Sequence, residues 1–196
     1  LMRENNVPEW YIESCKKIKY LFPKAHAVAY VMMAFRVAYF KVYYPKAYYA
    51  TYFTVRADEF DADYMAVGKE KIKENLLEFR DKEDATTKEK NMVTILEICN
   101  EMYARGIEFL PIDIYESDST RFLPKEDGIL LPLNSIAGFG GQAAESVLEA
   151  RKDGPFRTID DFRERTKVSK TIIQIMREKG YLSGIPETSQ VNLFEL

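Results

Sequence analysis

Apolar and aromatic residues are dense in the first sixty positions, and their spacing predicts helices. Pro8 and Pro23 bracket a short amphipathic segment, and Pro23 lies where the first turn of a long helix tolerates proline. Pro45 closes this long helix, and the aromatic-rich residues 46–56 predict another one. The pattern indicates a dense all-α unit in this part of the chain.

After residue 60 the pattern becomes more polar but keeps a helical spacing. Residues 61–80 and 86–105 both fit a helix. The second helix begins with a capping box formed by Thr86 and Glu89 and ends at Gly106. The two segments together predict a helical hairpin.

Short β-prone runs replace the helical spacing between residues 107 and 133. They cover residues 112–115, 120–123 and 129–131, and Asp127-Gly128 is typical of a hairpin turn. A small β element is therefore expected between two helical parts.

Three more short helices are predicted, over residues 142–152, 159–165 and 171–179. Thr158 and Ser169 stand where a hydroxyl can cap a helix N-terminus, and Gly180 stands at a C-cap position. The whole pattern predicts a mainly α fold with a small β-hairpin element.

Composition permits a packed core, because 46% of the 196 residues are hydrophobic and 13% are aromatic. The length allows one large domain or two small ones. The net charge is −3, so a nucleic-acid surface has to be a local patch. This balance argues mildly against a purely electrostatic DNA binder.

Cys15 and Cys99 have no C-x-x-C spacing, which argues against zinc and favours free thiols in a reducing compartment. Leu1 is not followed by a basic and then apolar leader, and the apolar run of residues 25–44 carries ionisable side chains. We therefore expect a cytoplasmic protein with neither a signal peptide nor a membrane span. A start without methionine suggests a piece of a longer protein.

A glycine hairpin in residues 136–144 is the first stretch with distinctive chemistry. Its glycines let backbone N–H groups approach an anion at a helix N-terminus. With the small residues after it, the hairpin resembles a helix-hairpin-helix motif, and residues 154–171 extend the likeness to a tandem over residues 132–186. The alternative is a glycine-rich turn that only packs two helices.

Such a motif binds the phosphates of duplex DNA without reading bases, while basic side chains neutralise neighbouring phosphates. The candidate DNA-binding residues are Gly138, Phe139, Gly140, Gly141, Gln142, Arg151, Lys152, Lys167 and Lys170.

The last ten residues, 187–196, contain a Q-x-x-L-F pattern typical of a short docking peptide. Gln190 offers an amide to a backbone rim, and Leu193 and Phe194 offer apolar side chains to a pocket. The pattern predicts a tail that tethers the chain to a second protein.

The string from Phe22 to Tyr30 contains the only histidine, His26, one helical turn before Tyr30. Their rings can stack and face one target, and Lys24 and Arg36 supply charge nearby. From the residues alone, a core histidine beside a tyrosine stripe is the favoured interpretation.

The segment from Phe22 to Pro45 resembles the fingers helix of bacterial family C replicative DNA polymerases, the DNA polymerase III α subunits. Three strings favour the PolC (Gram-positive) type: F-P-K-A-H, the Y-A-T-Y-F-T-V-R-A-D-E-F of residues 49–60, and the final Q-V-N-L-F. One departure is Val191, where the clamp motif usually has leucine. The resemblance covers essentially the whole chain, as the C-terminal end of a much longer enzyme that also has a 3′–5′ exonuclease domain.

The resemblance implies that the full-length enzyme adds nucleotides to a primer with Mg²⁺ ions held by palm carboxylates outside this chain. No catalytic or metal-binding residue is expected here, because the aspartates at 58, 61, 63, 160 and 161 fit helix capping. The fragment alone should be inactive.

The resemblance divides the chain into fingers helices (1–60), a helical hairpin of the fingers (61–106), a β-ribbon connector (107–131), the helix-hairpin-helix domain (132–186) and the tail (187–196). The fingers would bind the incoming dNTP, the helix-hairpin-helix domain the primer-template duplex, and the tail the sliding clamp, the β subunit. The nucleotide-side residues implied are Phe22, Lys24, His26, Tyr30 and Arg36.

A rival hypothesis is a non-enzymatic helix-hairpin-helix adaptor recruited by a sliding clamp. It explains residues 132–196 equally well but leaves the string from Phe22 to Tyr30 unexplained. A third, weaker alternative is a helical scaffold in which every motif is packing.

Overall fold

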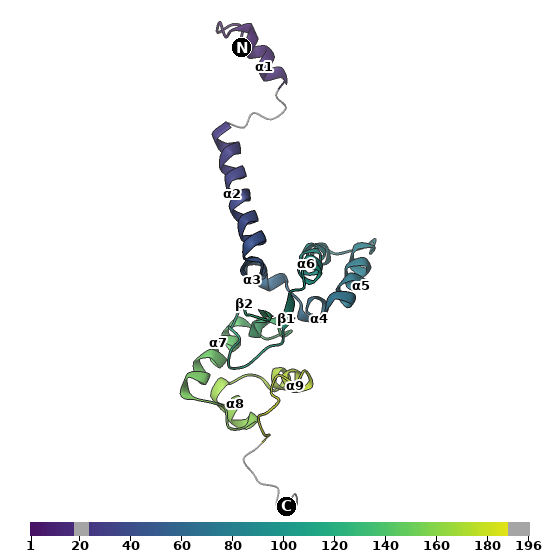
Figure 1. The fold of residues 1–196 in the computed structure, drawn as a ribbon, viewed down its shortest axis with the longest axis vertical. Helices are drawn as coiled ribbons and strands as arrows, with labels where there is room; N and C mark the ends of the chain where they lie inside the picture. Colours follow the sequence, from purple (N-terminus) through teal and green to yellow (C-terminus); the bar gives the residue numbers. More distant parts are fainter. Residues whose placement is uncertain (18–23, 188–196) are drawn as a thin grey trace, which may run out of the picture. The chain divides into compact units, whose positions relative to one another are not determined.

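Helices dominate the computed structural model, which describes residues 1–17 and 24–187 (Figure 1). In these ranges the chain has nine α-helices and a three-stranded sheet, so the predicted mainly α fold is confirmed. The contacts divide the chain into two units, Leu1–Tyr43 and Tyr44–Leu196. The residue boundaries of the finer predicted domains remain predictions.

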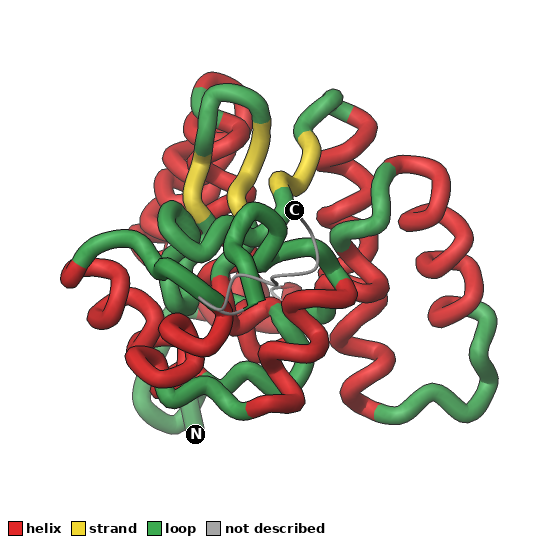
Figure 2. The backbone as a smooth tube through the Cα atoms, turned by 90° about the horizontal axis from the view of Figure 1, so that it is seen from below, coloured by secondary structure: helices red, strands yellow, loops and turns green. Residues whose placement is uncertain are grey.

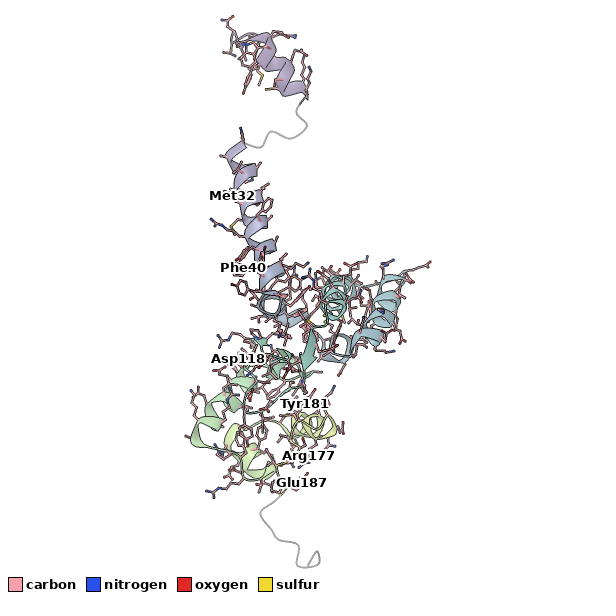
Figure 3. All side chains as sticks on the ribbon, in the orientation of Figure 1. Met32, Phe40, Asp118, Arg177, Tyr181 and Glu187 are labelled. Carbon is pink, nitrogen blue, oxygen red and sulfur yellow. The ribbon has the colours of Figure 1, made fainter. Side chains whose placement is uncertain are left out.

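The first unit contains α1 (Glu9–Lys17) and α2 (Lys24–Tyr43). Only Ile12 of α1 is buried, and no described residue of α2 is. The predicted long helix is therefore present, and its large apolar side chains are exposed; Met32 and Phe40, labelled in Figure 3, are two of them. Apolar residues occupy almost every position of α2, so all sides of the helix are apolar.

In the second unit, the predicted helix after Pro45 is α3 (Pro45–Val55). Its Phe53 is fully buried and packs against Phe109 and Phe122, with ring centroids 5.1 and 5.6 Å away. Phe109 and Phe122 follow Phe53 by more than fifty residues, and together the three rings anchor α3 beside the small sheet.

The predicted helical hairpin is formed by α5 (Lys69–Arg80) and α6 (Thr87–Ala104), which pack together. The capping box of Thr86 and Glu89 is confirmed: the Thr86 hydroxyl accepts the Glu89 N–H, and the Glu89 carboxylate accepts the Thr86 N–H. These reciprocal bonds fix the start of α6.

One prediction in this region is wrong, because residues 61–80 do not form a single helix. The short α4 (Ala62–Met65) ends before Gly68, whose φ of 83° begins a new helix. The Tyr103 hydroxyl stabilises this break between α4 and α5, because it donates to the Met65 carbonyl (3.0 Å) and accepts the Gly68 N–H (3.2 Å).

The sheet contains β1 (Glu108–Leu110), β2 (Leu123–Pro124) and β3 (Gly128–Leu130) in the order β1-β3-β2 (Figure 2). Strands β2 and β3 form the predicted antiparallel hairpin, and β1 pairs with β3 in parallel. Gly128 permits this pairing, because a Cβ there would lie 2.4 Å from the Glu108 carbonyl oxygen.

The strand expected over residues 112–115 is wrong. Asp113 instead accepts the N–H groups of Tyr115 and Glu116 (2.7 and 2.9 Å), which folds this segment into a turn. An aspartate that bonds the backbone ahead of it competes with a strand.

Three short helices follow the sheet: α7 (Gly141–Ala150), α8 (Ile159–Thr166) and α9 (Lys170–Glu178). The predicted caps are confirmed, since Thr158 accepts the Asp161 N–H (3.0 Å) and Ser169 accepts the Ile172 N–H (3.3 Å). Each helix buries one apolar face in a core that continues to α3. In residues 1–17 and 24–187, no helix combines the length and hydropathy that crossing a membrane requires.

Candidate nucleic-acid interface

The first hairpin joins the 3-10 turn Leu133–Ser135 to α7. Gly138 has a φ of 78°, which an L side chain rarely adopts, and the Phe139 N–H donates to the Ile136 carbonyl (2.9 Å). The chain then enters α7 through Gly140, the N-cap residue. Glycine therefore adopts the left-handed conformation at position 138 without steric cost.

Glycine has a different effect at position 140. Gly140 has φ −64° and ψ 153°, a backbone conformation open to any residue, and no atom lies within 4 Å of the point that its Cβ would occupy. No side chain caps α7. The first N–H groups of a helix have no partner within the helix, so this N-terminus can receive an anion.

The second hairpin joins α8 to α9 with the same backbone. Lys167 has a φ of 57°, as Gly138 has 78° in the first hairpin. The next residue is buried and apolar in both, and Ser169, with φ −65° and ψ 152°, repeats the N-cap conformation of Gly140. The tandem of two hairpins predicted from the sequence is therefore present in the backbone.

The chemistry of the second hairpin differs from that of the first. The Ser169 hydroxyl caps α9, so one of its N–H groups is already satisfied. This hairpin presents exposed Lys167 and Lys170 side chains, which line a shallow hollow together with Arg163. Asp160 and Glu164 line the same hollow, so its charge is mixed.

Two candidate DNA-binding side chains take part in packing, and their role in DNA binding remains a prediction. The Phe139 ring is buried in the core, and its N–H is used inside the turn. The Arg151 guanidinium donates to the carbonyls of Ser117 (2.7 Å) and Ile114 (3.4 Å) and so ties the end of α7 to the preceding loop. Both residues stabilise the hairpin from the inside.

The other candidates in this domain are exposed. Lys152 forms an ion pair with Glu149 (2.6 Å) in which both side chains are exposed, and such a surface pair contributes little energy. Gly141 and Gln142 form the first turn of α7, next to the open position at Gly140.

The sequence did not point to Arg165, which fixes the segment that connects the two hairpins. Its guanidinium donates to the carbonyls of Ala150, Gly154 (3.0 Å) and Pro155 (3.3 Å) and lies over the Phe156 ring, 4.6 Å from the centroid. The carbonyls belong to the last residue of α7 and to the linker between α7 and α8, so Arg165 fixes that linker. No local pattern marks this role, because it depends on the fold of the linker.

The predicted nucleotide-side residues lie on α2 as far as they are described. The rings of His26 and Tyr30 meet edge-on, with centroids 4.5 Å apart and planes at 70°. Tyr30 remains 66% exposed, and Lys24 and Arg36 are exposed on the same helix. Phe22 lies outside the described residues.

The docking residues Gln190, Leu193 and Phe194 also lie outside the described residues. Their role remains a prediction.

Within the described part of the chain, no group of three or more histidine, cysteine, aspartate or glutamate side chains could hold a metal ion. Two of the suspected carboxylates are capping groups: Asp61 accepts the Asp63 N–H (3.0 Å), and Asp161 accepts the Arg157 N–H (2.9 Å).

Part of this chain matches a known family model, which identifies the class of motif that it contains. Residues 106–190 match the family model of the helix-hairpin-helix motif. This match contains β1 to β3, both hairpins and α7 to α9.

The relatives are longer proteins, and the similarity to them extends over nearly the whole of this chain. "DNA polymerase III PolC-type" of Caldanaerobacter subterraneus subsp. tengcongensis is 56% identical over 98% of the chain, that of Clostridium perfringens 56% over 99%, and that of Thermotoga maritima 50% over 98%. The chain covers 14% of the length of each of these relatives. The chain belongs to the PolC-type DNA polymerase III family, as one segment of such a protein.

Proposed function

We propose that this chain holds the primer-template duplex in a replicative DNA polymerase and contributes one helix to the pocket for the incoming dNTP. The observation that carries the proposal is the start of α7, which has no side-chain cap and open space beside Gly140. It lies in a segment that matches the helix-hairpin-helix motif.

The first hairpin would bind DNA through its backbone. N–H groups at the start of α7 would donate to the oxygens of one phosphate, and the helix dipole favours this anion. Because the donors touch no base edge, such binding is independent of sequence and weakens as salt rises. The exposed Lys167 and Lys170 of the second hairpin would neutralise further phosphates.

Helix α2 would contribute to the nucleotide side. A helix that is apolar all round belongs in the interior of a larger protein, so we propose that other parts of the polymerase cover most of α2. The exposed Tyr30 ring, supported at its edge by His26, would stack on the nascent base pair, with Phe22 nearby. Lys24 and Arg36 would attract the triphosphate.

The rest of the proposal follows from the family relationship. Metal ions held by carboxylates outside this chain would supply the chemistry, and this chain's residues would only bind and orient DNA and nucleotide. The tail would dock Leu193 and Phe194 in the sliding clamp. A non-enzymatic adaptor would account for residues 132–196 only, whereas the similarity to the polymerases extends over 98% of the chain.

Duplex binding tests the first part. The affinity of the full-length protein for two duplexes of unrelated sequence is measured by anisotropy over a range of salt concentrations. We expect equal affinities for both duplexes, and affinities that fall steadily with salt. Strong discrimination between the duplexes, or binding that ignores salt, would contradict backbone recognition.

Steady-state kinetics of the full-length enzyme with saturating primer-template tests the second part. Tyr30→Ala should raise the KM for dNTP by about tenfold, because loss of a base stack costs roughly 1–3 kcal/mol. Tyr43→Ala is the matched control, since Tyr43 lies on the same helix and is also 66% exposed. Equal KM values for both variants, with lowered thermal stability, would favour a packing role for Tyr30.

A further inference from the structure

An arginine outside both hairpins lies beside the start of α7. The loop of residues 117–122 packs on the turn that leads into the first hairpin, because the N–H groups of Leu133 and Asn134 donate to the carbonyls of Asp118 (2.9 Å) and Ser119 (3.0 Å). At the tip of this loop, the Thr120 methyl group lies 3.9 Å from the position of a Cβ on Gly141.

Asp118 fixes the arginine that follows (Figure 3 labels Asp118). Its carboxylate accepts the N–H groups of Thr120 (3.1 Å) and Arg121 (3.0 Å), and it also accepts the Arg121 guanidinium through Nε (3.1 Å) and Nη2 (2.8 Å). One carboxylate thus sets both the backbone of the loop and the direction of the side chain.

This ion pair differs from an ordinary surface pair in the burial of its members. The Asp118 side chain is only 12% exposed, whereas the Arg121 side chain is 69% exposed. In the pair of Lys152 and Glu149, by contrast, both side chains are about equally exposed. A buried acid that holds an exposed arginine presents the guanidinium to solvent in one orientation.

The guanidinium keeps binding capacity toward DNA. Of its five N–H groups, Asp118 uses two, and three remain for a phosphate. Asp118 chiefly, and Glu145 of α7 more weakly, raise the pKa of Arg121, and the guanidinium stays charged.

We propose that Arg121, oriented by Asp118, binds a DNA phosphate next to the one held by the N–H groups of the first hairpin. The inference rests on the proposed duplex binding. It adds Arg121 as a positively charged side chain that binds DNA beside the first hairpin. Arg151, the arginine that the sequence motif suggests for this role, is half-buried and donates through Nη1 to the carbonyls of Ser117 and Ile114.

The test measures the affinity of the full-length protein for one duplex over a range of salt, for the wild type and for Arg121→Gln and Arg121→Lys. Arg121→Gln should bind several-fold more weakly, and its slope of log affinity against log salt should be smaller by about one, as for the loss of one phosphate contact. Arg121→Lys keeps the charge beside Asp118 but loses the planar fork, so its affinity should fall while its slope stays unchanged.

Arg80→Gln is the matched control, because Arg80 is an exposed arginine on α5, which lies apart from α7 (Figure 1). If Arg121→Gln binds as tightly as Arg80→Gln while the wild type shows salt-dependent binding, this inference fails and the proposed function stands. If the wild type itself does not bind duplex DNA in a salt-dependent way, both fail.

Discussion

The two hairpins share one backbone but use opposite chemistry at the helix N-terminus. Gly140 and Ser169 agree within 1° in both φ and ψ, yet glycine leaves α7 without a side-chain cap and serine caps α9. The same turn can therefore keep its N–H groups for a ligand or use one of them for its own stability. We infer that the first hairpin binds DNA through its backbone and the second through lysine side chains.

The largest effect on stability is expected at Gly138. An alanine there must adopt the left-handed conformation at φ 78°, which costs roughly 1–2 kcal/mol. Urea unfolding of the 196-residue chain measures this loss. Gly140→Ala is the control and should lose much less stability, because the φ of −64° at this position suits any residue. Equal losses of stability would contradict the special role of the positive φ at Gly138.

Removal of the cap in the second hairpin should have the next largest effect. Ser169→Ala leaves the Ile172 N–H without its partner and should lower the free energy of unfolding by about 1 kcal/mol. The same urea titration measures it, and DNA affinity should change less than twofold. A larger loss of affinity than of stability would show that the Ser169 hydroxyl itself contacts DNA.

The loop beside the first hairpin should respond to acid. Burial raises the pKa of Asp118, but the hydrogen bonds from Arg121 and Thr120 outweigh it and lower this pKa to about 2. A carboxylate with a lowered pKa stabilises the fold above its unfolded pKa, and this stability is lost as the pH falls toward 2. Asp118→Asn should therefore flatten the stability profile between about pH 4 and pH 2; an unchanged profile would contradict the role given to this carboxylate.

The smallest effect should come from giving the first hairpin the chemistry of the second. Gly140→Ser can cap α7 as Ser169 caps α9, so we expect a gain of a few tenths of a kcal/mol in stability together with weaker duplex binding. Urea unfolding and anisotropy measure the two changes. A gain in stability with unchanged DNA affinity would show that the N–H groups at the start of α7 do not bind DNA.

Local signals explain which parts of the fold were predictable. Pro45 marks the end of the long helix, and the caps at Thr86, Thr158 and Ser169 are read from residues within one turn. The break at Gly68 was missed because Tyr103, 35 residues away, holds it. The parallel pairing of β1 with β3 is equally non-local.

The same distinction applies to the site. The hairpin glycines follow a short motif, so their place in the turn was predictable from the sequence. The burial of Phe139, the occupation of Arg151 by loop carbonyls and the presentation of Arg121 by Asp118 depend on how the loop of residues 113–122 packs. A motif identifies which residues form the turn, but tertiary packing decides which side chains remain available.

Backbone binding by the first hairpin is tested by placing valine at each of the two N-cap positions in the full-length protein. Both positions accept valine by their backbone angles, and no atom lies within 4 Å of the Cβ position at Gly140. Gly140→Val should place methyl groups where the phosphate approaches α7 and weaken duplex binding by about tenfold, equivalent to about 1.4 kcal/mol, whereas Ser169→Val should change it less than twofold. Equal losses of affinity for the two variants, or no loss for Gly140→Val, would contradict backbone binding by the first hairpin.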